Sequence, residues 1–251
     1  MASNMHELRL DGLTALVTGA GSGIGAAVAR LLADRGARVC VNDLREESCA
    51  AVTEEINRSK GTAVSAPGDV ANSDAVREIV DTTVQAFGSI HILVNNAGKG
   101  GTGKRFAQLE ESEWTEMLRV NLGSVFAMTH VVLPHIPRDG SGRIINMSSM
   151  FGISGAAGSV HYSAAKAGMI GFSKALAREL AEEKITVNAV APGIIDTPMF
   201  RARGVKPGPP WLLWPRLGTP EDIAQTVAFL SSRAGEFITG QVISPNGGGV
   251  I

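Results

Sequence analysis

The feature that most constrains the fold is an alternation of short, apolar, β-branched runs with longer segments of helical pattern. The runs expected to form strands are 13–18, 37–42, 62–66, 90–95, 143–147, 184–190 and 241–244. The segments expected to form helices are 23–36, 46–60, 73–87, 111–135, 160–182 and 221–231, with Ser112 as a possible cap of the fourth. Strands joined by helical crossovers are parallel, and short right-handed connections place helices on both faces of the sheet. We therefore predict a single α/β domain over residues 1–251, built on a doubly wound parallel sheet.

Composition excludes several classes of protein. With 44% hydrophobic and 19% charged residues, the chain is typical of a globular protein. A formal net charge of -1 without a run of either sign provides no basic face for nucleic acid. We find no apolar run of about 18 residues, so no membrane span is expected, and the polar residues 1–11 do not suggest a signal peptide. Cys40 and Cys49 have no metal-like or redox-like spacing, which favours free thiols in a reducing cytoplasm.

A glycine-rich turn joins the first predicted strand to the first predicted helix. Residues 18–25 read TGAGSGIG. Bare glycine backbone lets a pyrophosphate approach closely, and the helix N-terminus offers N–H groups and the positive end of its dipole. Asp43 follows the second strand, where a ribose-binding acid is expected in dinucleotide sites. The pattern therefore predicts a Rossmann-type site.

Two acidic residues bear on the choice of cofactor. A carboxylate at Asp43 accepts hydrogen bonds from a ribose hydroxyl but repels a 2′-phosphate, so NAD is expected rather than NADP, although Arg45 lies two residues on. Asp69, after the third strand, is expected to hold the adenine amino group, with capping of the next helix as its alternative role.

Tyr162 and Lys166 lie one turn apart in a predicted helix, so the ammonium can sit beside the phenol. A phenol has a pKa of about 10, and a neighbouring cation lowers the pKa. A solvated helix face is the alternative.

Several motifs occur together in a recognisable order. They are residues 18–25, Asn95-Asn96-Ala97-Gly98, Asn121, Ser149, Tyr162-x-x-x-Lys166 and Pro192-Gly193. In order and spacing they resemble the short-chain dehydrogenases/reductases of common length, from about residue 10 to the end of the chain. The resemblance implies an oxidoreductase that moves a hydride between a nicotinamide and a carbinol or ketone carbon.

The resemblance implies four catalytic residues. Tyr162 is the acid/base for the substrate oxygen, and Lys166 lowers the pKa of Tyr162 and holds the nicotinamide ribose. Ser149 hydrogen-bonds the substrate oxygen. Side chains alternate along a strand, so only one of Ser148 and Ser149 should face the site, and the spacing to Tyr162 selects Ser149. Asn121 interrupts helical bonding and supports a water that leads to Lys166, unless it is a buried asparagine satisfied locally.

The resemblance also implies the cofactor contacts. Residues 95–98 stabilise the sheet and border a ribose, and Ile195 and Thr197 grip the nicotinamide carboxamide. The residues expected to bind the cofactor are Gly19, Ser22, Gly23, Ile24, Gly25, Asp43, Asp69, Val70, Asn95, Ala97, Gly98, Tyr162, Lys166, Pro192, Gly193, Ile195 and Thr197. No metal is expected, because the five histidines form no cluster with ligand spacing. His161 points about 100° away from its neighbour Tyr162, so it is expected in packing or a subunit contact.

Substrate choice is expected to lie in the proline-rich segment 198–220, helped by residues 99–106 and 150–159. Trp211 and Trp214 indicate either a lid over a hydrophobic substrate or a contact with a neighbouring subunit, and both stay open. A homotetramer that pairs the helices of 111–135 and 160–182 is implied by the resemblance alone.

Three functions stay open. The main hypothesis is an NAD-dependent enzyme that interconverts a secondary alcohol and a ketone on a small hydrophobic or hydroxyacyl substrate. The alternative is a 3-oxoacyl-[acyl-carrier-protein] reductase using NADPH, whose acidic carrier would need basic residues near the entrance. Arg138 is one candidate, but residues 182–184 are of mixed charge. A non-catalytic NAD(H)-binding regulatory protein is disfavoured, because Ser149, Tyr162 and Lys166 are all present.

Overall fold

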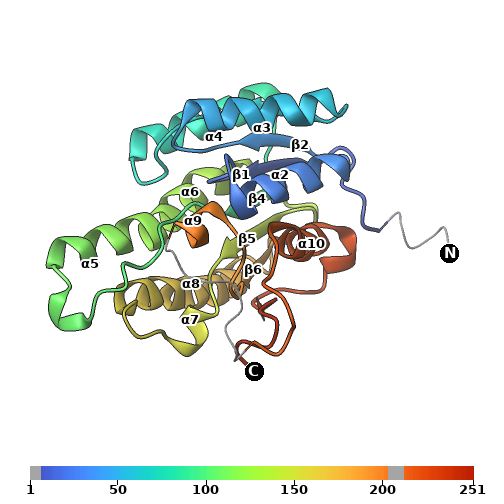
Figure 1. Ribbon diagram of the computed structural model, residues 1–251. Helices are drawn as coiled ribbons and strands as arrows, with labels where there is room; N and C mark the ends of the chain where they lie inside the picture. The colour runs from blue at the N-terminus through green and yellow to red at the C-terminus, as the bar shows by residue number, and fades with distance from the viewer. Residues whose placement is uncertain (1–6, 203–211) are drawn as a thin grey trace.

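The computed structural model describes residues 7–202 and 212–251. Within these residues, seven parallel strands form one sheet in the order β3-β2-β1-β4-β5-β6-β7, with helices on both sides (Figure 1). The strands are β1 (Thr14–Val17), β2 (Arg38–Val41), β3 (Thr62–Ser65), β4 (Ile92–Asn95), β5 (Arg143–Met147), β6 (Thr186–Val190) and β7 (Val242–Ile243). Each begins and ends within two residues of the expected run, and the doubly wound α/β fold is confirmed.

Two hydrophobic cores lie on opposite faces of the sheet, because successive side chains of a strand point to opposite sides. Val17, Val41 and Val94 pack on one face with helices α2, α3 and α10, whereas Leu16 and Leu93 pack on the other with α4, α6 and α8. The longer helices are α2 (Gly23–Asp34), α3 (Glu46–Arg58), α4 (Ser73–Phe87), α5 (Glu111–Leu118), α6 (Ser124–Val132), α8 (Val160–Glu179) and α10 (Pro220–Ser231). Short segments are η1 (Phe106–Gln108), η2 (Arg119–Gly123), η3 (Leu133–His135), α7 (Phe151–Ser154), α9 (Pro198–Arg201) and η4 (Arg233–Gly235).

Two helix starts differ from the sequence-based expectation. Helix α5 begins after Glu110, whose N–H donates to the Glu113 carboxylate at 3.1 Å, so Ser112 lies inside the first turn and is not the cap. Helix α4 is capped by Asn72, whose Oδ1 accepts from the N–H groups of Asp74 at 2.9 Å and Ala75 at 3.1 Å. The alternative role of Asp69 as this cap is therefore wrong.

The helix expected over 111–135 is interrupted. Between α5 and α6 the five residues of η2 form a π turn, and η3 closes the segment as a 3₁₀ turn. Asn121 Nδ2 donates to the Met117 carbonyl at 3.2 Å, and the Ser124 hydroxyl donates to the Val120 carbonyl at 2.6 Å. These side-chain bonds engage helix carbonyls within and next to the π turn. The expectation that Asn121 interrupts helical bonding is confirmed.

By length and hydropathy, Glu111–His135 is the one helical stretch of the described residues that could cross a membrane, which the sequence inspection missed. The core helix of a globular protein meets the same criterion. Met128 and Val132 are fully buried and pack in the core beside the sheet. The apolar character of this stretch is therefore explained by its place in the fold.

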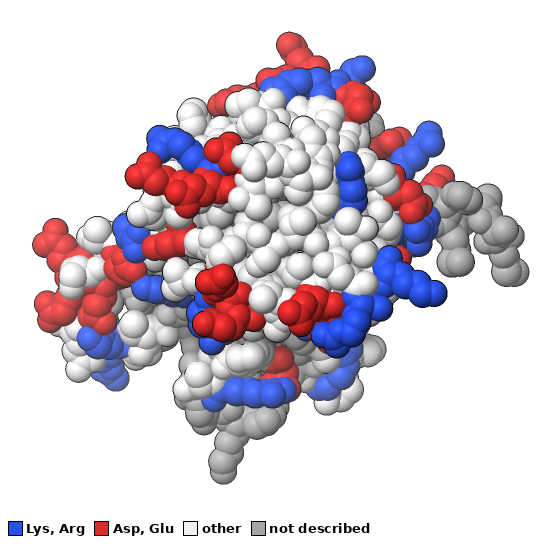
Figure 2. Space-filling view, turned by 90° about the horizontal axis from the view of Figure 1, so that it is seen from above, with Lys and Arg blue, Asp and Glu red and all other residues white. Residues whose placement is uncertain are grey.

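Charges of both signs are mixed over the surface. Figure 2 shows basic and acidic side chains side by side around the rim of one face, with an uncharged area between them. Many are paired, for example Arg30 with Glu55 at 2.7 Å and Arg77 with Asp74 at 2.7 Å. The face shown carries no extended field of a single sign, in keeping with the composition.

Candidate active site

A cavity lies at the carboxyl ends of the strands, where the winding of the sheet reverses. Strand β1 pairs with β2 on one side and with β4 on the other. The chain therefore runs from β1 toward one edge of the sheet and, after β3, crosses back to continue toward the other edge. Ligands of doubly wound sheets bind at such a switch point. The cavity has a volume of about 430 Å³.

The glycine turn after β1 is locked against the loop after β4. The Thr18 hydroxyl accepts from the N–H groups of Asn96 and Ala97, both at 3.0 Å, and Asn96 Nδ2 donates to the Thr18 carbonyl at 2.9 Å. Gly19 has a φ of +62°, and a Cβ there would lie 2.8 Å from the Cα of Ala97. Only glycine allows this approach without strain, which explains why the turn needs a bare backbone.

Asp43 faces the same turn. Its Oδ2 accepts from the Gly21 N–H at 3.0 Å, and its Oδ1 accepts from the Arg45 N–H at 3.2 Å. A Cβ at Gly21 would come within 2.8 Å of the Asp43 carboxylate. The structure thus puts a carboxylate against the glycine turn and on the cavity wall, as expected, whereas the Arg45 side chain is exposed and is not part of the wall.

Tyr162 and Lys166 line the cavity from one face of α8. The Lys166 Nζ lies 5.7 Å from the centre of the Tyr162 ring and donates to the Met147 carbonyl at 2.7 Å. Burial lowers the pKa of the Lys166 ammonium to about 8. The alternative of a solvated helix face is wrong for this pair, because Lys166 is only 4% exposed.

The two serines at the end of β5 have different partners. The Ser148 hydroxyl donates to the Lys166 carbonyl at 2.8 Å, whereas the Ser149 hydroxyl accepts from the Phe151 N–H at 3.2 Å. Ser149 therefore keeps its hydroxyl hydrogen for another acceptor. Both serines are among the residues of the wall, but only the Ser148 hydroxyl is bonded to the helix, so the selection of Ser149 for the substrate oxygen stays a prediction.

Asn121 is fully buried at the π turn and also borders the cavity. Its Oδ1 accepts from the Lys99 N–H at 3.2 Å, and its Nδ2 also lies 2.8 Å from the Met117 sulfur. The carboxamide is therefore held at both ends by the protein. These local partners agree with the alternative of a locally satisfied asparagine, while its place on the wall keeps the catalytic role as a prediction.

The cavity brings together all but three of the expected site residues. Those on the wall are Gly19, Ser22, Gly23, Ile24, Gly25, Asp43, Ala97, Gly98, Asn121, Ser149, Tyr162, Lys166, Pro192, Gly193, Ile195 and Thr197. Asn95 is turned into the core, where its Nδ2 donates to Thr129 and Asn146. Val70 is buried in the core, and Asp69 lies in the loop before α4, where its Oδ1 accepts from the Ala71 N–H at 2.9 Å.

The wall also contains residues from the segments expected to border the cofactor or to select the substrate, namely Asn96, Lys99, Phe151, Met199 and Phe200. Met147 was not anticipated, and Asn96 rather than Asn95 faces the wall because neighbouring side chains of a strand point to opposite sides. Phe151 lies on α7, a single turn without a periodic pattern. His161 is buried with both ring nitrogens unpartnered, and burial lowers the pKa of its imidazole, in keeping with its expected packing role.

The proline-rich segment contributes through its beginning. Thr197 accepts from the Phe200 N–H at 3.2 Å and caps α9, which brings Met199 and Phe200 to the cavity. Trp211 and the rest of 203–211 lie outside the described residues. Trp214 is 61% exposed and borders a separate cavity of about 200 Å³ with Ile195 and Arg216. Among the residues described, no three His, Cys, Asp or Glu side chains gather as metal ligands.

Most of the chain is similar to one family of known proteins. Residues 13–207 match the family model described as short chain dehydrogenase. A 3-oxoacyl-[acyl-carrier-protein] reductase of Thermotoga maritima is 40% identical and covers 97% of this chain and 100% of its own. The (2S)-[(R)-hydroxy(phenyl)methyl]succinyl-CoA dehydrogenase subunit BbsD of Thauera aromatica is 41% identical over 93% of this chain and 95% of its own. A solved 7α-hydroxysteroid dehydrogenase, in complex with NADH and 7-oxo glycochenodeoxycholic acid, superposes with a TM-score of 0.92 at 32% identity, covering 98% and 97% of the two chains.

Proposed function

Because the chain belongs to the short-chain dehydrogenase family, we propose that it interconverts a secondary alcohol and a ketone with NAD(H), on a small hydrophobic or hydroxyacyl substrate. As a member of the family, it is an oxidoreductase that acts on CH–OH groups with NAD(P). The finer proposal is carried by one observation, which is that Ser149, Tyr162 and the buried Lys166 ammonium line the same cavity as the glycine turn.

The residues present fit a dinucleotide. The side chain of Ser22 makes no capping hydrogen bond, so no side chain at this cap competes with an anion for the first N–H groups of α2. A Cβ at Gly25 would lie 2.3 Å from the Gly19 carbonyl oxygen, so the turn keeps its shape only with glycine. Asp43 would accept hydrogen bonds from a ribose hydroxyl and repel a 2′-phosphate, which supports NAD over NADP.

The residues of the cavity divide the work on the substrate oxygen. A bound nicotinamide gives or accepts the hydride. The Tyr162 phenol gives its proton to that oxygen in reduction and takes it back in oxidation. The Lys166 ammonium stabilises the negative charge on the phenol oxygen. The Ser149 hydroxyl, which accepts from Phe151, donates its hydrogen to the substrate oxygen and stabilises the charge that develops there.

A 3-oxoacyl-[acyl-carrier-protein] reductase using NADPH is the second candidate. The relatives favour it over the main proposal, since most of those compared bear that name, including the one from Thermotoga maritima. The position of Arg138 disfavours it. Its guanidinium pairs with Glu183 at 2.8 Å. Arg138 also lies just before β5, at the amino ends of the strands, whereas the cavity lies at their carboxyl ends. The relative from Thauera aromatica, named as acting on a CoA thioester, supports a free thioester instead.

The test is a comparison of kcat/KM for NADH and NADPH with one 3-oxoacyl group carried by CoA or by acyl carrier protein, alongside cyclic and aryl ketones. We expect a preference for NADH and no gain from the carrier protein. A preference for NADPH together with much faster turnover of the carrier-linked substrate would establish the second candidate. Asp43→Ala should shift the preference toward NADPH, because the repulsion of the phosphate is removed.

Tyr162→Phe in the same assay tests the chemistry. Removal of a general acid/base costs about 10²- to 10⁴-fold in rate, and the variant should still bind NADH. Retention of most activity would refute the role of the phenol. Binding of NADH by the wild type without turnover of any substrate would favour a regulatory protein. A homotetramer and a cytoplasmic location are part of the proposal on the family resemblance only, and sedimentation and fractionation test them.

A further inference from the structure

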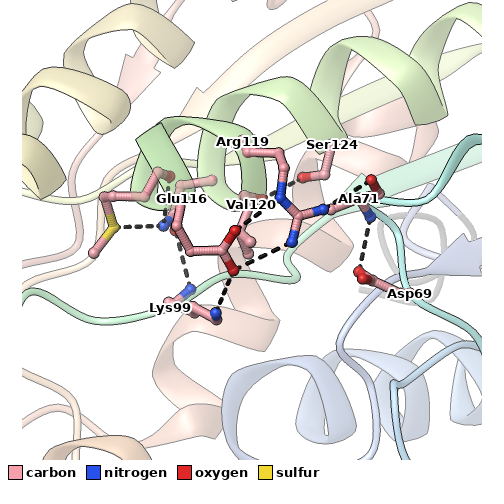
Figure 3. Close-up of polar contacts among 9 residues, drawn as sticks. Asp69, Ala71, Lys99, Glu116, Arg119, Val120 and Ser124 are labelled. Atoms are coloured by element: carbon pink, nitrogen blue, oxygen red, sulfur yellow. Dashed lines mark hydrogen bonds and ion pairs between the residues drawn. The ribbon is translucent and has the colours of Figure 1, made fainter. Parts of the chain in front are cut away.

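A carboxylate on α5 holds two cations beside the cavity (Figure 3). Glu116 Oε2 accepts from the Arg119 Nε at 2.8 Å, and its Oε1 accepts from Arg119 Nη2 at 3.2 Å and from the Lys99 Nζ at 2.6 Å. Because it accepts from Arg119 and Lys99, the pKa of the Glu116 carboxyl is lowered to about 2. The guanidinium is therefore oriented by a two-point contact with a carboxylate that stays ionised at neutral pH.

The orientation of Arg119 directs its third nitrogen to another loop. Arg119 Nη1 donates to the Ala71 carbonyl at 2.9 Å, across 48 residues of sequence. The N–H of the same Ala71 donates to Asp69 Oδ1 at 2.9 Å. Figure 3 shows the guanidinium, Ala71 and Asp69 following one another in that order. A continuous set of hydrogen bonds thus runs from α5 to the acid that follows β3.

The same carboxylate is connected to the catalytic side of the cavity. Lys99 lines the cavity, and its N–H donates to the Oδ1 of Asn121 at 3.2 Å. Glu116 consequently binds one residue of the loop after β4 and one residue of the π turn. Isolated surface ion pairs contribute little, but two-point arginine contacts within a network are the exception.

We propose that Arg119 is a positioning residue for the adenosine half of the cofactor, which it serves by fixing Ala71 and thereby the carboxylate of Asp69. This inference rests on the proposed cofactor site and on the prediction that Asp69 receives the adenine amino group. Glu116 orients the guanidinium through its two-point contact. Neither residue touches the reacting atoms, and Arg119 acts on cofactor affinity through Asp69.

The experiment measures binding of ADP-ribose, which carries the adenosine half without the nicotinamide, by calorimetry on the full chain. Arg119→Met should weaken binding by about three- to tenfold, the effect of one ordinary hydrogen bond. Arg119→Lys keeps the charge but cannot contact Glu116 and Ala71 together, so it should bind nearly as weakly. Arg77→Met removes an exposed cation from α4, the helix that follows the same loop, and should bind like the wild type. Wild-type affinity of Arg119→Lys would reduce the effect to charge and overturn the inference.

A double-mutant cycle tests whether Arg119 acts through Asp69. In an Asp69→Ala background, Arg119→Met should weaken ADP-ribose binding no further, because the group that it positions is already gone. Full additivity of the two losses would overturn the inference. The proposed function fails separately, since a wild type that does not bind ADP-ribose loses the cofactor site itself. Equal affinity of the wild type and Arg119→Met overturns only the role of Arg119.

Discussion

The buried ammonium of Lys166 should make the stability of the cofactor-free protein depend on pH in a defined way. Burial lowers its pKa from the ordinary 10.5 to about 8. Each pKa unit is worth about 1.4 kcal/mol, so keeping this ammonium charged inside the fold costs about 3 kcal/mol. Between pH 8 and 10.5 the unfolded chain binds more protons than the folded one, so the free energy of unfolding rises with pH. The cost is fully present below about pH 8 and is removed as the pH approaches 10.5.

Lys166→Met removes this titration. The difference in unfolding free energy between Lys166→Met and the wild type should therefore fall by about 3 kcal/mol between pH 7 and 10.5. Urea unfolding at four pH values measures it, with both proteins also carrying Tyr162→Phe because Lys166 alters the pKa of that phenol. The remaining titratable groups are common to both proteins and cancel in the difference. Lys174→Met removes an exposed ammonium from the same helix and serves as the control. A difference that stays constant over this range would refute the reasoning, because it would mean that Lys166 is as well solvated in the folded protein as in the unfolded chain.

Three further substitutions test the surroundings of the site. Ser148→Ala removes the bond that holds the Lys166 backbone, so kcat should fall several-fold, and an unchanged kcat would mean that this bond does not position Lys166. Gly25→Ala puts a Cβ 2.3 Å from the Gly19 carbonyl oxygen. Thermal unfolding should therefore show that the free energy of unfolding is lower by about 1–3 kcal/mol, and calorimetry should show weaker binding of NADH. Asn72→Ala removes the cap of α4, which should cost about 1 kcal/mol in urea unfolding, whereas Asn72→Asp should be nearly neutral.

Most of the architecture could be predicted because buried parallel strands have a plain signature. The run 90–95, for example, contains the continuous apolar stretch 92–94, and it is bounded by a turn and a helical pattern. The glycine turn and Asp43 could be placed for the same reason, since each directly follows a strand end. The break in the helix of 111–135 could not be located from periodicity, because it depends on the Asn121 carboxamide competing for one carbonyl.

The expected site residues that lie off the cavity wall do so because of the direction of single side chains. Asn95 and Asn96 are adjacent and chemically identical, yet the pleat of β4 turns one into the core and the other onto the cavity wall. Asp69 stands apart from the wall because the loop before α4 is shaped by Ala71 and by the cap at Asn72. Spacing along the chain contains neither fact. Long-range contacts such as that of Arg119 with Ala71 likewise cannot be predicted from spacing along the chain, because they depend on how the loops meet in the folded protein.

The π turn between α5 and α6 is, in effect, one surplus residue accommodated in a regular helix. Loss of a single residue there would let the helix close with an uninterrupted set of backbone hydrogen bonds, and the segment would gain stability. It would also rotate everything beyond the deletion by about 100° relative to what precedes it. The Asn121 carboxamide could then no longer meet Lys99 and the cavity while α6 kept its packing in the core. An irregularity that weakens the helix is thus what allows one segment to serve the hydrophobic core and the reaction centre together.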